Sequence, residues 1–248
     1  MLLKQLINNL PKEKKNININ GLTVSSKNIK KGFIFFAIKG RQFNGEKYIN
    51  ESIKKGAKVI ICSNDCNFKN DNIAVFKVQN IRNFLSEVTS KFYSLKPNNI
   101  IAVTGTNGKT SVADFFYQIL EINKIPVATI GTLGIKCKGK IIKTNLTSPD
   151  TISLHKYLHY LKKKKIDNVA IEASSHGLHQ KRMHHIKFKA GIFTNFSQDH
   201  LDYHKTMRSY LNAKLILFKK ILSKNTTIIS DREIHPFSKL TLIGNKKN

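Results

Sequence analysis

A glycine-lysine-threonine turn carries the clearest chemistry in this 248-residue chain. It reads Thr-Gly-Thr-Asn-Gly-Lys-Thr and follows directly on an apolar run. Gly105 and Gly108 leave room for backbone N–H groups to approach phosphate oxygens. Lys109 can neutralise the terminal phosphates, and the hydroxyl of Thr110 can hold Mg²⁺. The segment therefore predicts a phosphate loop for ATP, whose nucleotide-binding residues are Gly105, Thr106, Asn107, Gly108, Lys109 and Thr110.

The loop departs from the usual phosphate-loop spacing at one position. Val103 stands where that pattern has its first glycine, five residues before Gly108. A glycine-rich turn that joins a strand to a helix and binds no ligand is the alternative interpretation. Residues elsewhere in the chain are needed to decide between the two.

Three other polar segments come directly after apolar runs, at residues 147–150, 172–182 and 194–204. Ligands of a parallel α/β sheet gather where the strands end, so these segments are candidate active-site loops. Glu172 ends one apolar run, and its carboxylate would be costly to bury without a cation or a hydrogen-bond donor. Mg²⁺ beside Thr110 would supply that cation.

The elements that must position these loops follow an α/β pattern. Apolar runs and turn residues predict a small N-terminal α/β domain over residues 1–96, with a boundary near Lys96 and Pro97. Residues 97–248 are expected to form a phosphate-loop domain with a mainly parallel sheet flanked by helices. The expected strands are 33–38, 59–61, 74–78, 100–104, 126–130, 168–172, 190–194 and 226–229, and the expected helices are 48–56, 80–95, 109–123, 151–164 and 206–222.

The net charge of +28 and the isoelectric point near 10.1 would ordinarily indicate a nucleic-acid partner. Lysine, however, accounts for all but five of the 43 basic residues and is spread along the whole chain. Arginine is the residue that reads guanine edges, so this composition argues against specific nucleic-acid recognition. A basic phosphate-loop ATPase acting on nucleic acid remains an alternative.

Cysteine usage and hydropathy indicate the compartment. Cys62, Cys66 and Cys137 form neither an even set nor a paired zinc-type spacing, so free thiols in a reducing compartment are expected. No apolar run approaches the length of a membrane span, and the start of the chain lacks the features of an export signal. The chain is therefore expected in the cytoplasm, without a membrane partner.

Four motifs together resemble those of the Mur ligase family, in the same order. They are the phosphate loop, Thr-Ser-Pro-Asp at 147–150, Glu-Ala-Ser-Ser-His-Gly-Leu at 172–178, and the segment from Phe193 to His204. Within that family the chain looks closest to the branch that adds the third amino acid of the peptidoglycan precursor. The resemblance implies an ATP-dependent ligase that joins diaminopimelate or lysine to UDP-N-acetylmuramoyl-L-alanyl-D-glutamate through an acyl phosphate.

The resemblance also implies roles for individual residues. Lys109, His200 and Lys214 are expected to be catalytic, the last as a carbamate formed on its amine. Mg²⁺ is expected at Thr110, Glu172, His200 and the Lys214 carbamate. The positions that resemble substrate contacts are Val24, Ser26, Arg41, Gln42 and Phe43 for the uridine nucleotide, and Thr147, Ser148, Ser174, Gln180 and Arg182 for the muramoyl dipeptide.

Four basic residues have other interpretations. Taken alone, Lys214 would be an exposed lysine on a helix, since nothing near it in the sequence proves burial. His200 and His204 have the i, i+4 spacing found in zinc hydrolases, but the H-E-x-x-H glutamate is missing, which favours Mg²⁺. His155 is expected at the surface or behind the site.

The resemblance covers the first two of the family's three domains. The third domain, which selects the amino acid and helps to complete the ATP site, is not visible, and the central domain is expected to be incomplete at its C-terminal end. The segment after Ser230 also lacks the Asn-Ala-Asp-Asp-like step of the family. Three interpretations stay open: a ligase whose remaining part lies on a separate chain or outside this sequence, a non-catalytic remnant, and a protein that binds a UDP-sugar or ATP.

Overall fold

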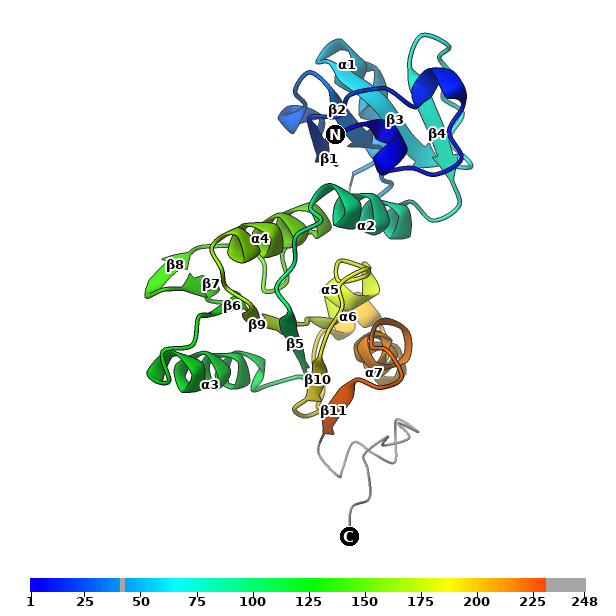
Figure 1. The fold of residues 1–248 in the computed structure, drawn as a ribbon. Helices are drawn as coiled ribbons and strands as arrows, with labels where there is room; N and C mark the ends of the chain where they lie inside the picture. Colours follow the sequence, from blue (N-terminus) through cyan, green and yellow to red (C-terminus); the bar gives the residue numbers. More distant parts are fainter. Residues whose placement is uncertain (41–42, 231–248) are drawn as a thin grey trace. The chain divides into compact units, whose positions relative to one another are not determined.

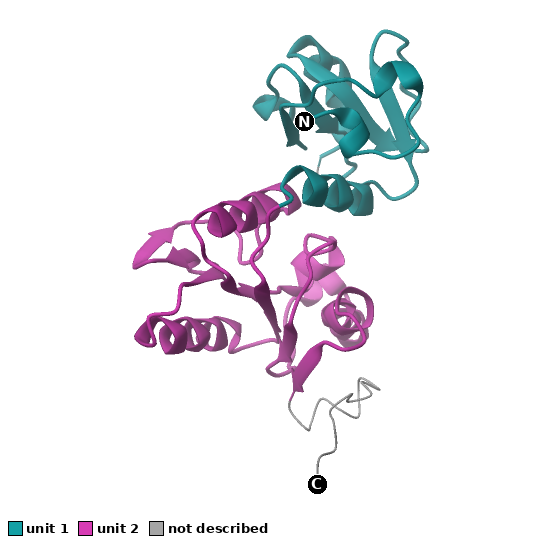
Figure 2. Ribbon diagram, viewed as in Figure 1, with its two compact units in different colours: residues 1–94 teal, residues 95–248 magenta. Residues whose placement is uncertain are grey.

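The computed structural model describes residues 1–40 and 43–230. The chain divides into two compact units, residues 1–94 and the residues from 95 onward (Figure 2). The division falls beside Lys96, where the sequence predicts a boundary. The segment after Ser230, for which the sequence suggests a departure from the family, lies outside the described residues.

Unit 1 contains a four-stranded parallel sheet whose strands follow their order along the chain. Phe35 and Ile60, from neighbouring strands, are fully buried in its core. Asn80 begins the last helix by accepting a hydrogen bond from the Asn83 amide at 3.1 Å, which confirms the predicted cap. The elements are β1 (Gly21–Thr23), β2 (Phe33–Phe36), β3 (Ala57–Ser63), β4 (Ala74–Val78), α1 (Ile49–Lys54) and α2 (Ile81–Phe92), with 3₁₀ turns η1 (Leu3–Gln5), η2 (Lys12–Lys14), η3 (Ser26–Asn28) and η4 (Gly45–Tyr48).

Unit 2 contains a seven-stranded sheet in the order β11-β10-β5-β9-β6-β7-β8 (Figure 1). Its first five strands in that order pair in parallel, and they confirm the strands predicted for this part of the chain. They are β5 (Asn99–Thr104), β6 (Val127–Gly131), β9 (Asn168–Glu172), β10 (Ala190–Phe193) and β11 (Thr227–Ser230).

An antiparallel hairpin at one edge of this sheet lies outside the predicted elements. In it, β7 (Gly134–Cys137) pairs with β6 and with β8 (Lys140–Ile142). Lys138 and Gly139 join the two strands with φ values of +49° and +70°, which is the geometry of a tight two-residue turn. The sheet is therefore mainly parallel, as predicted, but it has an antiparallel edge.

The helix predicted over residues 206–222 is regular only in its first part. After α7 the turn widens, and the Leu222 amide donates to the Leu217 carbonyl at 2.9 Å. The widened turn lets Leu217 and Phe218 both enter the core, where the Phe218 ring stacks on Phe193. The helices of unit 2 are α3 (Lys109–Ile122), α4 (Thr151–Lys163), α5 (Ser175–His179), α6 (Leu201–His204) and α7 (Met207–Ile216), with the π turn η5 (Leu217–Ile221).

The polar loops of unit 2 follow parallel strands that are held together by a buried apolar core. α4 contributes three fully buried leucines at helical spacing, Leu154, Leu158 and Leu161. The strands β5, β6, β9 and β10 are adjacent members of one parallel set, so their carboxyl ends lie at the same edge. None of the described helices has the length and apolarity that a membrane span requires.

Candidate active site

The phosphate loop lies between β5 and α3, and its glycines are required by its shape. Gly108 is the N-cap of α3 and has a φ of +77°, a conformation that side chains disfavour. Gly105 lies so close to Thr194 that a Cβ at residue 105 would overlap the Thr194 hydroxyl. Val103, at the position of the first glycine of the usual phosphate-loop pattern, is a fully buried strand residue. Both positions of the loop therefore favour glycine, Gly108 because of its positive φ and Gly105 because of its contact with Thr194.

Lys109 folds back over the loop that it follows. Its Nζ donates to the carbonyl of Gly105 at 3.0 Å and to that of Thr106 at 2.7 Å. Burial lowers the pKa of Lys109, while the carboxylates of Glu172 and Asp199 act in the opposite direction. The ammonium is therefore held against the loop, where a phosphate group could take the place of the carbonyls.

Glu172, at the end of β9, is 2% exposed and its carboxylate meets hydrogen-bond donors. Its Oε2 accepts from the Thr110 hydroxyl and from the Thr132 hydroxyl, each at 2.9 Å, and its Oε1 accepts from the Thr132 amide at 3.0 Å. A Cβ on Gly131 would overlap this carboxylate. The protein thus brings a hydroxyl and a carboxylate together beside the loop, and these are the hard oxygen ligands that Mg²⁺ takes.

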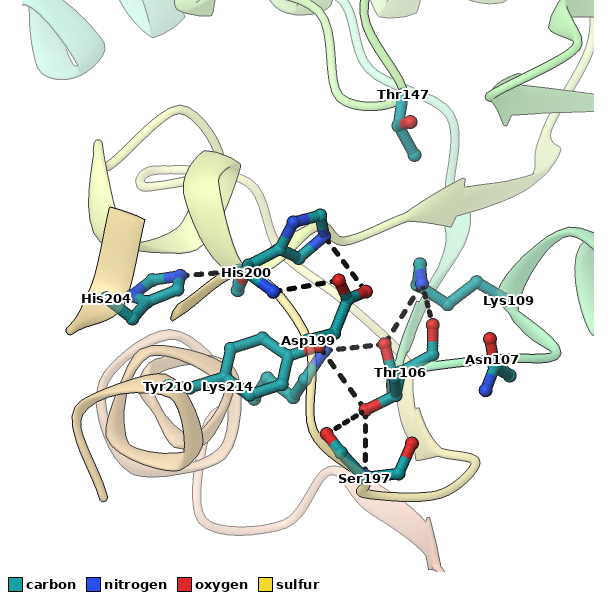
Figure 3. A network of polar contacts seen from close by, with 12 residues as sticks. Thr106, Asn107, Lys109, Thr147, Ser197, Asp199, His200, His204, Tyr210 and Lys214 are labelled. Carbon is teal, nitrogen blue, oxygen red and sulfur yellow. Dashed lines mark hydrogen bonds and ion pairs between the residues drawn. The ribbon is translucent and has the colours of Figure 1, made fainter. Parts of the chain in front are cut away.

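Lys214 is 1% exposed, so its interpretation as a surface lysine is wrong. The amine donates to the Gly105 carbonyl at 2.5 Å and lies 4.4 Å from the centre of the Tyr210 ring (Figure 3). Burial and then the charge of Lys109 lower the pKa of Lys214 to about 7. A substantial fraction of the side chain is therefore the neutral, nucleophilic amine at neutral pH.

His200 is the N-cap of α6 and has a positive φ of 52°. Asp199 orients it: the His200 amide donates to Asp199 Oδ1 at 2.8 Å, and the ring Nε2 lies 3.3 Å from Oδ2 (Figure 3). His204 lies instead with its Nε2 3.0 Å from the Ser175 hydroxyl, and burial lowers its pKa to about 4. Among the described residues, no three His, Cys, Asp or Glu side chains gather as a metal site.

A cavity of about 250 Å³ joins the loop to the later segments. Four predicted site residues that follow in sequence, Thr147, Ser174, His200 and Lys214, line it together with the loop itself. Glu172 reaches it through its hydrogen bonds to Thr110 and Thr132. The lining residues are Thr106, Asn107, Gly108, Lys109, Thr110, Ser111, Thr132, Thr147, Ser174, Ser175, His200 and Lys214.

The other predicted dipeptide contacts form a hydrogen-bonded group beside this cavity. Arg182 donates through Nη1 to the Ser148 carbonyl at 2.6 Å and through Nη2 to the Gln180 side chain at 2.8 Å. The Ser148 hydroxyl donates to the Ser174 hydroxyl at 2.9 Å. The structure thus connects Ser148, Ser174, Gln180 and Arg182, while Thr147 is joined through its hydroxyl to Thr132 at 3.1 Å.

The predicted uridine contacts belong to unit 1. Val24 is 40% exposed and Phe43 is 73% exposed, whereas Ser26 is buried at the start of a 3₁₀ turn. Arg41 and Gln42 lie outside the described residues. The two exposed apolar side chains offer surfaces on which a base could lie, and nothing more is fixed by their positions.

Five residues that contact the site were given no individual role by the sequence: Thr194, Asn195 and Asp199, which lie in the predicted 194–204 loop, and Thr132 and Tyr210, which lie outside the predicted loops. The Thr106 hydroxyl, for example, lies 3.3 Å from the Tyr210 hydroxyl and also bonds to the main chain of Ser197 (Figure 3). Tyr210 precedes Lys214 by four residues on α7, a spacing that places both on one helix face and could have indicated the contact.

These features define a class of protein. A glycine-lysine-threonine loop joins a parallel strand to a helix, and a buried acidic residue on the adjacent strand faces the threonine of the loop. That arrangement is typical of P-loop α/β proteins, in which the loop approaches phosphate groups.

The chain belongs to the Mur ligase family. Residues 103–246 match the Mur ligase middle domain, and residues 18–93 match the domain described as Mur ligase family, catalytic domain. The resemblance carried by the four sequence motifs is thereby confirmed.

Two relatives carry the name UDP-N-acetylmuramoyl-L-alanyl-D-glutamate–2,6-diaminopimelate ligase. The chain is 39% identical to the one from Brucella melitensis over 232 residues and 43% identical to the one from Rickettsia bellii over 222 residues. These matches cover 92% and 88% of this chain but 48% and 45% of the relatives. The chain therefore spans about half the length of the curated relatives it matches.

Solved structures share the fold. A UDP-N-acetylmuramoyl-L-alanyl-D-glutamate–2,6-diaminopimelate ligase superimposes with a TM-score of 0.78 at 24% identity, over 96% of this chain and 49% of that one. A MurF ligase from Thermotoga maritima, solved in complex with ADP, gives a TM-score of 0.59 at 19% identity, over 90% of this chain and 48% of that one. The fold class predicted from the sequence is confirmed by these likenesses.

Proposed function

We propose that this chain carries the substrate-binding and ATP-binding parts of an ATP-dependent amide ligase. Its reaction would join diaminopimelate to UDP-N-acetylmuramoyl-L-alanyl-D-glutamate, as the names of the relatives suggest. The observation that carries the proposal is the cavity in which Lys109, Thr110, His200 and Lys214 meet although they come from segments far apart in sequence. The proposed site is thus assembled by the fold and does not rest on the loop motif alone.

The nucleotide would bind with its triphosphate at residues 105–110. Amides at the start of α3 would approach the phosphate oxygens, and Lys109 would exchange the carbonyls of Gly105 and Thr106 for the terminal phosphates. Thr110 and Glu172 would hold Mg²⁺, which would supply positive charge close to the phosphate groups. His200, held by Asp199, would lie near this ion.

Lys214 would act after conversion to a carbamate. The ammonium first loses one proton, and the neutral amine then attacks the carbon of CO₂. An N–C bond forms, one C–O π pair moves onto oxygen, and a second proton leaves the nitrogen, which gives the carbamate anion. The lowered pKa of Lys214, about 7, supports this step because only the neutral amine can react. The carbamate oxygens would be ligands for a second Mg²⁺.

The muramoyl dipeptide would bind along Thr147, Ser148, Ser174, Gln180 and Arg182, with the planar Arg182 side chain facing an anionic group. Residues 1–96 would hold the uridine nucleotide through Val24, Ser26, Arg41, Gln42 and Phe43, and residues 97–248 would hold ATP. The remaining part of the reaction machinery of the longer relatives could be supplied by a further segment or by a separate chain. The cytoplasm is the proposed location, which the three free thiols favour.

In the proposed reaction a carboxylate oxygen of the dipeptide attacks the γ-phosphorus of ATP, and the bond to ADP breaks. The amine of diaminopimelate then attacks the acyl carbon, phosphate leaves with the bonding electron pair, and the amine loses a proton. The loop and the bound cations would stabilise the charge that develops on the transferred phosphoryl group.

The experiment that tests this function has two stages. Calorimetry with Mg²⁺ and a non-hydrolysable ATP analogue, and separately with UDP-N-acetylmuramoyl-L-alanyl-D-glutamate, measures whether each ligand binds. ADP release and product mass are then followed with diaminopimelate, and with lysine as the comparison amine. Binding of both ligands without amide formation would favour a UDP-sugar or ATP-binding protein, and a chain that binds neither would contradict the proposal.

A further inference from the structure

The segment that follows β10 is fastened to the phosphate loop by side-chain contacts. Thr194 and Asn195, here called the Thr194–Asn195 bracket, lie about 90 residues beyond the loop in sequence and reach it across the β5–β10 pair. Sheet pairing alone would place the two backbones side by side. The side-chain contacts come in addition, and they converge on the main chain of one loop residue, Asn107.

The Thr194 side chain contacts the phosphate loop at Asn107 and at Gly105. Its hydroxyl donates to the Asn107 carbonyl at 2.5 Å, with the Thr104 carbonyl at 3.3 Å, and it occupies the space that a Cβ on residue 105 would need. The Thr194 Cβ also lies 3.7 Å from where a Cβ on Gly108 would be. One threonine therefore lies beside the loop at both glycines. At Gly105 the close path is possible only because the residue lacks a Cβ, whereas at Gly108 a Cβ would make ordinary van der Waals contact.

The Asn195 side chain forms hydrogen bonds with both main-chain polar groups of Asn107. Its Oδ1 accepts from the Asn107 amide at 2.8 Å, and its Nδ2 donates to the Asn107 carbonyl at 3.3 Å. The main-chain carbonyl of Asn195 accepts from the Thr106 amide at 2.9 Å. The amides of Thr106 and Asn107 are thus already engaged, so a triphosphate would be met by the amides nearer the helix and by Lys109.

We infer that Thr194 and Asn195 are positioning residues for the nucleotide. They hold residues 105–108 in the conformation that points the amides at the start of α3, together with Lys109, towards the phosphates. The inference rests on the proposed ATP binding and deepens it, because it states which residues keep the loop formed before a nucleotide arrives. Preorganisation of this kind raises affinity by removing an ordering cost from the binding step.

Two pairs of variants test the inference by calorimetry with Mg²⁺ and the ATP analogue. Thr194→Val removes the hydroxyl at nearly constant shape, and Thr194→Ser keeps it. Asn195→Ala removes the contacts to the Asn107 peptide, and because Asn195 is exposed the fold should survive. We expect Thr194→Val and Asn195→Ala each to weaken analogue binding about tenfold, as expected for one or two lost hydrogen bonds, and Thr194→Ser to bind within about twofold of the parent.

Asn168→Ala is the matched control. Asn168 also bonds through its side-chain amide to a main-chain carbonyl, that of Pro126 at 3.0 Å, but it begins β9 at the opposite edge of the sheet. It should leave analogue affinity unchanged. Melting temperature and affinity for the UDP-dipeptide are measured for every variant, because a merely structural role would shift these quantities together with the analogue affinity.

The outcomes separate the inference from the function beneath it. If the parent chain binds no ATP analogue, the proposed function fails and the inference fails with it. If the parent binds and Asn195→Ala and Thr194→Val bind equally well, only the inference is overturned. A loss of affinity in Asn168→Ala equal to that in Asn195→Ala would also overturn it, since the effect would then be general to the sheet.

Discussion

On α7, Lys214 is 1% exposed and donates to the Gly105 carbonyl, whereas on α4 His155 is fully buried and neither of its ring nitrogens has a hydrogen-bond partner among the described residues. Burial and then the charge of Lys96 lower the pKa of His155 from 6.5 to about 3. The pKa of Lys214 falls from 10.5 to about 7, which leaves it near neutral pH. Of the two positions expected for His155, the surface is wrong, because this side chain is fully buried on α4.

These two buried basic side chains differ in what surrounds them, and that difference indicates their roles. His155 is kept neutral across the physiological pH range and cannot exchange a proton there, so its role is packing. Lys214 lies between two protonation states near neutral pH and faces a cavity with a carbonyl, an aromatic ring and a second lysine around it. Burial alone does not indicate chemistry, but burial with a partner at a cavity does.

The largest expected effect tests the packing role of His155. Its folded pKa lies below its unfolded value of 6.5, so stability is fully present above pH 6.5 and falls as the pH drops towards 3. Between pH 7 and pH 4 this side chain should cost roughly 3 kcal/mol of unfolding free energy. Urea unfolding at pH 7, 5 and 4 measures the loss.

His155→Leu should remove that share of the acid sensitivity, and His185→Leu, at an exposed position, should not. Burial lowers the pKa values of His184 and His204 to about 4. These two side chains therefore leave the same remaining dependence of unfolding free energy on pH in both variants. An unchanged pH dependence in His155→Leu would show that the imidazole is not held neutral as described.

The next largest effect tests the chemical role of Lys214. Lys214→Met keeps the length of the side chain but removes the amine, and the rate of ADP formation with both substrates should fall about 100-fold or more, the usual scale for losing a charge-stabilising group. Lys219→Met on the exposed side of the same helical segment is the control and should keep the parental rate. Equal rates in the two variants would place Lys214 with His155 as a packing residue.

A third test uses pH on the lysine itself. Carbamate formation needs the neutral amine, so uptake of labelled CO₂ by the protein should fall as the pH drops through about 7 and decrease up to tenfold for each further pH unit. Carbon-13 NMR of the carbamate carbon follows this uptake, and Lys214→Met provides the background. A midpoint near 10, the ordinary lysine range, would contradict the lowered pKa.

The smallest expected effect concerns the aromatic wall of the Lys214 site. Tyr210→Leu removes the ring that shields the Lys214 side chain from water and the hydroxyl contact to Thr106, which should reduce kcat about fivefold through loss of roughly 1 kcal/mol. Tyr210→Phe keeps the ring and should lose no more than about twofold. If the two variants behave alike, the ring contributes nothing beyond its hydroxyl.

Local patterns in the sequence were sufficient for most of the elements. β4 and β9 occupy their predicted bounds, and Asn80 caps α2, because apolar runs bounded by polar turn residues determine these positions within a few neighbours. The β7–β8 hairpin was missed although Lys138-Gly139 between two short apolar runs is a recognisable turn signal. Its strands are only three or four residues long, and so each gives a weak pattern.

The site was predictable in composition but not in arrangement. Glu172 and the phosphate loop follow apolar runs, so their placement at a sheet edge could be inferred. The burial of Lys214 could not, since it depends on α7 packing beneath the loop more than 100 residues earlier in the chain. The contacts of Thr132 and of the Thr194–Asn195 bracket also depend on β6, β9, β5 and β10 being neighbours in the sheet in that order. Local sequence patterns do not indicate this strand order.

That strand order has a consequence for synthesis of the chain. β5 and the loop after it are made early, but β10 and its bracket are translated some 90 residues later. A nascent chain that has emerged only through α4 contains the whole glycine-lysine-threonine motif without the segment that holds it. On the proposed function, nucleotide affinity should therefore rise once β10 has joined the sheet, and the ligand should stabilise completed unit 2 more than the intermediates that precede it.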